Sequence, residues 1–244
     1  MIKLSVNVNK IATLRNARGG NNPSVIHAAQ TCIAAGCHGI TVHPRPDGRH
    51  IRQQDVFDLA ARLTAEFNIE GYPSPAFLDL VSQVHPTQCT LVPDPPDVLT
   101  SNAGWDLTGD VTWLTNVLKQ LQEQEIRTSL FLEPAPEQVR RAKDIGTDRI
   151  ELYTERYAKT FGTPEGQRVY EEYHRAAVVA QEIGLGLNAG HDLDLSNLPF
   201  LARHLPGLAE VSIGHALICD ALYMGLTTAV HAYLHALGYS TPRD

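Results

Sequence analysis

Short apolar runs alternate with longer amphipathic stretches along the whole chain. The short runs hold five to seven residues and are rich in Val, Ile and Leu. Their length and composition predict β-strands. The eight predicted strands cover residues 3–7, 39–43, 68–72, 88–93, 127–133, 149–154, 185–190 and 209–214.

The longer stretches show the 3.6-residue spacing of amphipathic helices. Leu114, Val117 and Leu121 would lie on one helix face, and residues 166–183 are long enough for about five turns. A last helix is predicted over residues 218–237. Proline and serine predict where helices begin, and glycine predicts where they end. The predicted starts are Pro23–Ser24, Ser74–Pro75 and Pro134–Pro136, and the predicted ends are Gly36, Gly146, Gly184 and Gly238.

Eight strand-then-helix units predict the fold class. In a chain of 244 residues they match the size and rhythm of an α/β protein with a (β/α)8 barrel. An open doubly wound sheet is the alternative, because the same alternation can build it, but a count of eight favours closure. No linker or composition shift divides the chain, so we expect residues 1–244 to form a single barrel domain.

Charge and composition argue against nucleic acids and membranes as partners of this protein. The 20 Lys and Arg residues against 27 Asp and Glu give a net charge of −7, and there is no basic run, which argues against nucleic acid. No apolar stretch approaches the roughly 20 residues that cross a membrane, and no signal peptide is evident, so we expect no membrane association and a cytoplasmic location. The four cysteines form no CxxC pair, which fits a reducing compartment.

Polar residues gather where the predicted strands end, which is the rim where barrels carry their chemistry. His43, Glu70 and His191 end the second, third and seventh strands and point toward one axial cavity. A carboxyl in an apolar barrel mouth has a raised pKa, and histidine titrates near neutrality, so the three could form an acid/base set. The alternative is that Glu70 sits in a structural ion pair and that both histidines fill the core.

Two loops carry candidate anion-binding residues. Arg15 and Arg18 lie in a long polar segment, 11–23, which we expect to be a loop, and Arg45 and His50 lie in the segment after the second strand. Paired guanidinium donors suit phosphate or carboxylate groups. Backbone amides near Gly214 and His215 would add a second anion seat, where barrels commonly bind phosphate. A solvated charged surface is the alternative explanation for these cations.

Five segments carry a family resemblance, and they span nearly the whole chain in order. They are NVNKIATLRNARG at 7–19, GITVHPRPDGRHI at 39–51, NIE at 68–70, LNAGH at 187–191 and SIGHA at 212–216. They resemble the pyridoxine 5′-phosphate synthase family. The resemblance implies a barrel that condenses 3-amino-2-oxopropyl phosphate with 1-deoxy-D-xylulose 5-phosphate, giving pyridoxine 5′-phosphate, phosphate and water.

The resemblance also assigns residues. It implies that His43 and Glu70 are proton acceptors and that His191 is a proton donor. Its binding positions match Asn7, Arg18, Gly214 and His215 for the amino ketone phosphate, and Asn9, Lys10, Arg45, His50 and Thr100 for the sugar phosphate. Asp192 is a further substrate-binding position, not assigned to either substrate. The resemblance implies two phosphorylated small-molecule substrates, no metal, no organic cofactor and a homo-oligomer, typically an octamer. Residues 93–104, which include Thr100, are expected to form a lid.

Two departures from the commonest family pattern stand near these positions. Asn9 and Lys10 replace an Asp-His pair that many members carry, and Asp192 stands where glycine is frequent. Two other functions stay open at this point. One is a metal-dependent phosphosugar aldolase or isomerase that uses His43, His50, His191 and His215, and the other is a non-catalytic barrel that binds phosphorylated metabolites.

Overall fold

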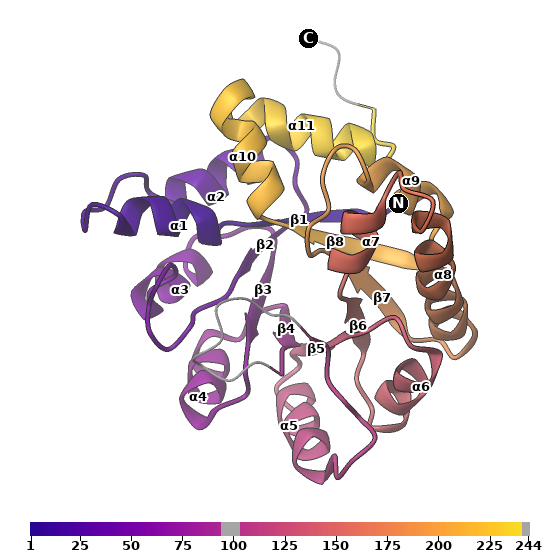
Figure 1. Ribbon diagram of the computed structural model, residues 1–244. Coiled ribbons are helices and arrows are strands. Elements are labelled where there is room, and N and C mark those ends of the chain that lie inside the picture. The colour runs from indigo at the N-terminus through magenta and orange to yellow at the C-terminus, as the bar shows by residue number, and fades with distance from the viewer. Residues whose placement is uncertain (94–102, 241–244) are drawn as a thin grey trace.

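Eight parallel strands close into one barrel in the computed structural model, which describes residues 1–93 and 103–240 (Figure 1). Each strand pairs with the next in the chain, and β8 pairs with β1. The predicted (β/α)8 barrel is therefore confirmed, and the open sheet is wrong. The strands are β1 Lys3–Asn7, β2 Gly39–Val42, β3 Glu66–Gly71, β4 Gln88–Leu91, β5 Arg127–Leu132, β6 Arg149–Leu152, β7 Gly186–Ala189 and β8 Leu208–Ile213.

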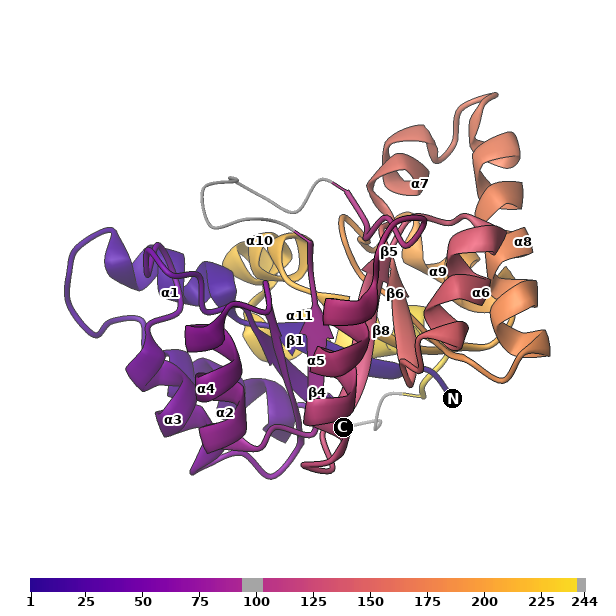
Figure 2. The same cartoon turned by 90° about the horizontal axis from the view of Figure 1, so that it is seen from below.

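Helices surround the strands on the outside of the barrel (Figure 1). Within the described ranges, none is long and apolar enough to cross a membrane. Figure 2 shows α1, α7 and α10 at one end of the barrel, the rim where the strands end. The helices are α1 Asn9–Asn16, α2 Val25–Ala34, α3 Gln53–Ala60, α4 Pro75–Val84, α5 Thr112–Gln122, α6 Pro136–Asp144, α7 Glu155–Thr160, α8 Gly166–Glu182, α9 Leu198–His204, α10 His215–Met224 and α11 Leu226–Ala236.

The predicted helix signals have physical counterparts in the structure. The side chains of Ser24 and Ser74 accept hydrogen bonds from the first backbone amides of α2 and α4. Pro136 occupies the first turn of α6, where its missing N–H costs nothing. Gly36 follows α2 with φ 96°, a left-handed conformation that ends the helix without steric penalty.

Two local predictions were wrong. The segment 11–23 is not a loop throughout, because its first part belongs to α1, which buries Ala12 and Arg15. The segment holds many polar residues, so the narrow face of α1 that packs on the barrel gives no clear helical pattern in the sequence. The predicted helix over 218–237 is two helices, since Gly225 adopts φ 83° between α10 and α11 and breaks the helical path.

Polar side chains fill the barrel interior toward the end where the strands begin, opposite the strand-end rim. Ser5 bonds Thr41 at 2.7 Å in a buried layer across β1 and β2. Nearer the strand starts, Arg127 pairs with Glu66 at 2.6 Å, and Glu210 lies 3.5 Å from a guanidinium nitrogen of Arg149. These bonds and ion pairs offset the cost of burying polar and charged groups inside the barrel.

Candidate active site

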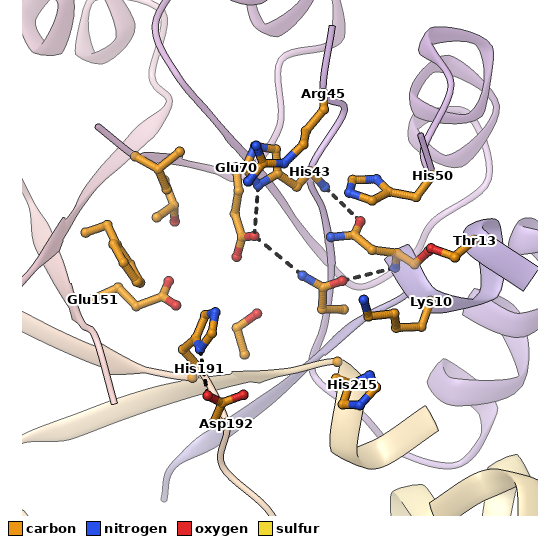
Figure 3. Close-up of a pocket in the computed structure, with 18 of the residues that line it drawn as sticks. Lys10, Thr13, His43, Arg45, His50, Glu70, Glu151, His191, Asp192 and His215 are labelled. Carbon is orange, nitrogen blue, oxygen red and sulfur yellow. Dashed lines mark hydrogen bonds and ion pairs between the residues drawn. The ribbon is translucent and has the colours of Figure 1, made fainter. Parts of the chain in front are cut away.

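A cavity of about 570 Å³ opens at the C-terminal ends of the strands. Figure 3 shows acidic, imidazole and cationic side chains converging on it from several strands and loops. Eleven of the thirteen residues predicted for the site line it: Asn7, Asn9, Lys10, His43, Arg45, His50, Glu70, His191, Asp192, Gly214 and His215. The fold thus brings together residues that lie far apart in the sequence.

Glu70 reaches the cavity from the end of β3. The side-chain amide of Asn7 donates a hydrogen bond to Oε2 of Glu70 at 3.4 Å, and Nδ1 of His43 lies 4.0 Å from the same oxygen. Burial raises the pKa of Glu70 to about 7, while the nearby His191 and Arg45 oppose that rise. A carboxyl with this pKa can both accept and release protons near neutrality.

His43 directly follows β2 and is held by Asn9. The side-chain oxygen of Asn9 accepts a hydrogen bond from the backbone amide of His43 at 2.9 Å. Burial lowers the pKa of His43 to about 3, and the charge of Arg45 adds to the effect. The ring is therefore neutral at physiological pH, the form in which an imidazole can accept a proton.

His191 enters the cavity from the segment after β7. The hydroxyl of Thr154 donates to the backbone carbonyl of His191 at 2.5 Å, and the Tyr153 ring packs edge-on against the imidazole with ring centres 5.0 Å apart. The Asp192 carboxylate lies 3.2 Å from Nδ1 of His191. The other ring nitrogen points into the cavity (Figure 3).

Glu151, on β6, is the main site residue that the sequence analysis did not select. It lines the cavity and is buried, and burial together with the carboxylates of Glu70 and Glu210 raises its pKa well above the usual range. Both effects favour the protonated form of its carboxyl. Its place at the end of a predicted strand was the signal that could have selected it. The other unpredicted lining residues are Thr13, Arg49, Thr90, Val92, Phe131, Gly190 and Ser212.

One cationic seat lies at the start of α10. Gly214 is the N-terminal cap of that ten-residue helix, and His215 and Lys10 line the cavity beside it. A side chain at Gly214 would meet Cβ of Asn7 at 3.0 Å, so the close approach of β1 requires glycine. Free backbone amides at a helix start, next to an ammonium group, suit a phosphate.

A second cationic seat lies after β2. Arg45 is buried there, with Arg49 and His50 beside it at the cavity wall. Nδ1 of His50 accepts a hydrogen bond from the amide of Ile51 at 2.9 Å, which leaves Nε2 as the donor. Burial and the charge of Arg45 lower the pKa of His50 to about 4, so the ring is a neutral hydrogen-bond donor.

Two cationic candidates stand apart from this cavity. Arg15 is buried and pairs with Asp55 at 2.5 and 2.8 Å, so its guanidinium is a structural group and not an anion ligand. Arg18 is exposed in the turn after α1 and does not line the cavity. Thr100 and most of the expected lid over 93–104 lie outside the described residues.

The histidines do not assemble into a metal site in the part of the chain that the structure describes. No group of three or more His, Cys, Asp and Glu side chains is placed there to hold an ion. The ring centres of His43 and His50 lie 6.2 Å apart.

Comparison with known proteins shows the family of this chain. The profile of the family described as pyridoxal phosphate biosynthesis protein PdxJ matches residues 4–238. The chain belongs to this family. The chain is 55% identical over 238 residues to the pyridoxine 5′-phosphate synthase of Phocaeicola vulgatus, which covers 97% of the chain and 99% of the relative. It is 52% identical over 237 residues to the enzyme of that name from Cytophaga hutchinsonii, with 97% and 99% covered. The resemblance that the five sequence segments carry is thus confirmed.

Solved structures give the same fold at low sequence identity. Phosphoribosylanthranilate isomerase from Thermotoga maritima superposes with a TM-score of 0.61 at 11% identity, over 98% of this chain and 99% of that one. Thiamine phosphate pyrophosphorylase from Pyrococcus furiosus gives 0.59 at 10% identity, over 97% and 96%. These likenesses concern the barrel alone.

Proposed function

We propose that this chain is a pyridoxine 5′-phosphate synthase that condenses 3-amino-2-oxopropyl phosphate with 1-deoxy-D-xylulose 5-phosphate. The products are pyridoxine 5′-phosphate, inorganic phosphate and water. One observation carries the proposal beyond family membership: a single cavity holds Glu70, His43 and His191 between two cationic seats. A condensation of two phosphorylated substrates needs such an arrangement, with proton carriers in the middle and anion seats at the sides.

The proton carriers have complementary protonation states. His43 is neutral and serves as a proton acceptor, because burial keeps its pKa near 3. Glu70, whose pKa is about 7, accepts a proton from carbon or nitrogen and can release it within the same cycle. His191 serves as the proton donor when hydroxyl groups leave as water. Glu151, whose burial favours the protonated carboxyl, can in that form donate a hydrogen bond to an oxygen that gains negative charge.

Each of the two cationic seats is assigned the phosphate group of one substrate. Gly214, His215 and Asn7 lie on the side assigned to the amino ketone phosphate, and Arg45, His50 and Asn9 lie on the side assigned to the sugar phosphate. Lys10, which the resemblance assigns to the sugar phosphate, lies between the two seats, within the same cavity as His215 and His50 (Figure 3). Fixing both substrates turns a bimolecular closure into an intramolecular one, which can lower the barrier by roughly 7–11 kcal/mol. The direct contact of Asn7 with Glu70 links one seat to the acid/base group.

The deciding experiment incubates the purified chain with both substrates and follows the absorbance of pyridoxine 5′-phosphate together with released phosphate. We expect both products in equal amounts. A folded protein that forms neither would refute the proposal. Exhaustive chelation beforehand tests the metal-dependent aldolase or isomerase, which predicts that turnover is lost.

Variants test the assigned roles. We expect Glu70→Gln, His43→Asn and His191→Asn to lower kcat by about 100-fold or more while still binding both substrates. His27→Asn is a matched control, because His27 is exposed on α2 and does not line the cavity. Binding of both substrates by the unaltered chain without any product would favour the non-catalytic barrel instead. Borohydride trapping followed by mass spectrometry would reveal an imine on Lys10.

Assembly, domain organisation and location are further parts of the proposal. We expect residues 1–244 to act as one domain and the chain to form a homo-oligomer, an octamer by family resemblance. Leu222 and Tyr223 on α10 support association, since they are 69% and 92% exposed. Sedimentation velocity measures the assembly size. A cytoplasmic location is supported by four free cysteines, of which Cys32, Cys37 and Cys89 are buried.

A further inference from the structure

The Nδ1 atom of His191 is a buried polar atom that meets no well-aligned hydrogen-bond partner among the described residues. The closest charged group is the Asp192 carboxylate, with Oδ2 3.2 Å away. That distance suits a hydrogen bond, and a small rotation of either side chain would align it. Catalytic hydrogen bonds often tighten in this way only when substrate binds.

The backbone at Asp192 explains how its side chain reaches the ring. Asp192 has φ 61°, in the left-handed region that favours glycine. The side-chain amide of Asn197 donates to the Asp192 carbonyl at 3.2 Å and holds this turn in place. Glycine would fit the backbone better, so the reason for an acidic residue here lies in its carboxylate.

The imidazole is restrained on its other sides as well. Tyr153 packs edge-on against it, and the Thr154 hydroxyl fixes the His191 carbonyl. Rotation of the ring about the Cβ–Cγ bond decides which nitrogen faces the cavity. Figure 3 shows Nδ1 toward Asp192 and the second nitrogen toward the cavity.

The Asp192 side chain carries a negative charge beside the His191 ring. The adjacent His191 ring holds the pKa of the Asp192 carboxyl below its usual range, and Lys159 and His215 act in the same direction. Asp192 is therefore ionised at neutral pH. The other titratable groups around the pair are Glu70, Glu151, Tyr153 and Glu155.

We propose that Asp192 is the positioning residue for His191, holding the Nδ1 proton so that Nε2 faces the substrates. The inference rests on the proposed synthase function, in which His191 donates a proton. When Nε2 passes its proton to a departing hydroxyl, the C–O bond breaks and water leaves. The ring is then neutral with its remaining proton on Nδ1, and the Asp192 carboxylate stabilises that tautomer.

Two substitutions separate positioning from structure. Asp192→Gly removes the carboxylate and relaxes the left-handed backbone, so the protein should melt no lower than the unaltered chain. Asp192→Asn keeps an oxygen that accepts from Nδ1–H but removes the charge. Glu155→Gln is the matched control, because it neutralises a carboxylate that bonds Tyr153 and Lys159 and not His191.

We expect Asp192→Gly to lower kcat about tenfold with KM within about twofold for both substrates, since an interaction with the proton donor acts on the chemical step. Asp192→Asn should recover part of the loss, and Glu155→Gln should stay within about twofold of the unaltered chain. An unchanged kcat in Asp192→Gly, or a raised KM with constant kcat, would overturn the positioning role.

Nitrogen-15 spectra of the histidine rings give a readout that does not depend on turnover. The His191 signals, assigned with His191→Asn, should show Nδ1 protonated in the unaltered chain and a shift toward the Nε2–H tautomer in Asp192→Gly. Identical tautomers in both proteins would contradict the inference. If the chain forms no pyridoxine 5′-phosphate, the proposed function fails, and these spectra still decide whether Asp192 orients the ring.

Discussion

The side-chain amide of Asn7 donates the hydrogen bond that supports the Glu70 carboxylate, at a long 3.4 Å. This contact joins the end of β1 to the end of β3 across the cavity floor. A long hydrogen bond from a neutral amide solvates a buried carboxylate poorly compared with water. The ionised form of Glu70 is therefore held at a cost to folding.

We expect Glu70→Gln to give a protein that is inactive and more stable at pH 8. The folded-state pKa of Glu70 is about 7 against an ordinary 4.5, so folding loses stability as pH rises between these values. Glutamine removes this loss, which amounts to at most about 3 kcal/mol for a shift of this size. The gain should be full above pH 7 and small near pH 4.5.

Urea unfolding of both proteins at pH 5 and pH 8 measures this difference. Glu123→Gln is the control, because Glu123 is exposed at the end of α5 and its substitution should shift stability equally at both pH values. Equal stability of Glu70→Gln and the unaltered chain at pH 8 would mean that burial of the ionised Glu70 carboxylate costs no folding free energy.

The same ionisation predicts the pH dependence of activity. If deprotonated Glu70 accepts a proton, kcat/KM should rise about tenfold per pH unit as the pH increases toward 7, and this rise should end near pH 7. His43 adds no step in this range, because its pKa is about 3. The measurement is kcat/KM from pH 5 to pH 9, with binding of inorganic phosphate measured in parallel to subtract ionisation of the substrates. A midpoint near 4.5 would contradict the effect of burial on Glu70.

Sequence patterns predicted the strands and the polar strand-end rim well because both depend on local composition. An apolar run that ends in His43 or Glu70 is visible in the chain itself, and barrel topology then collects the strand ends. Glu151 was passed over because inward and outward directions alternate along a strand, and composition alone does not say which strand-end carboxyl faces the cavity. The Asp192 contact with His191 depends on the sign of one backbone angle.

Ion pairs between residues far apart in the chain could not be predicted from the sequence, for a different reason. Arg15 and Arg18 occur three residues apart in the same polar stretch, yet one is buried and the other exposed. What separates them is Asp55, which comes from the start of α3 and lies forty residues along the chain from Arg15. Charge type and spacing carry no information on such a partner.

This pair of arginines supplies a matched test. Arg15→Met should lower the free energy of unfolding by about 2–3 kcal/mol, because it leaves the Asp55 carboxylate, 14% exposed, without its main counter-charge. Arg15 also donates to the His50 carbonyl at 3.1 Å, so the loop that carries His50 should loosen and KM for the sugar phosphate should rise. Arg18→Met should change stability by less than about 0.5 kcal/mol.

Urea unfolding and steady-state kinetics of both variants check this prediction. The double substitution of Arg15→Met with Asp55→Leu should recover stability, since it removes the unpaired charge along with its partner. Equal stabilities of Arg15→Met and Arg18→Met would show that the buried ion pair contributes nothing beyond a surface contact.

Gly190 sets the spacing between β7 and β8 at the cavity. A methyl group there would stand 2.4 Å from the Ser212 carbonyl oxygen and 3.0 Å from Oε1 of Glu151. Since the first of these atoms is backbone, Gly190→Ala should force the strand ends apart and lower stability by about 1–3 kcal/mol. Gly109→Ala is the matched control, because nothing lies within 4 Å of the added methyl. Displacement of Glu151 and of the adjacent His191 should also lower kcat. Thermal unfolding and turnover measurements on both variants test these two effects. A Gly190→Ala protein as stable and as active as Gly109→Ala would show that the strand ends can move apart at no cost.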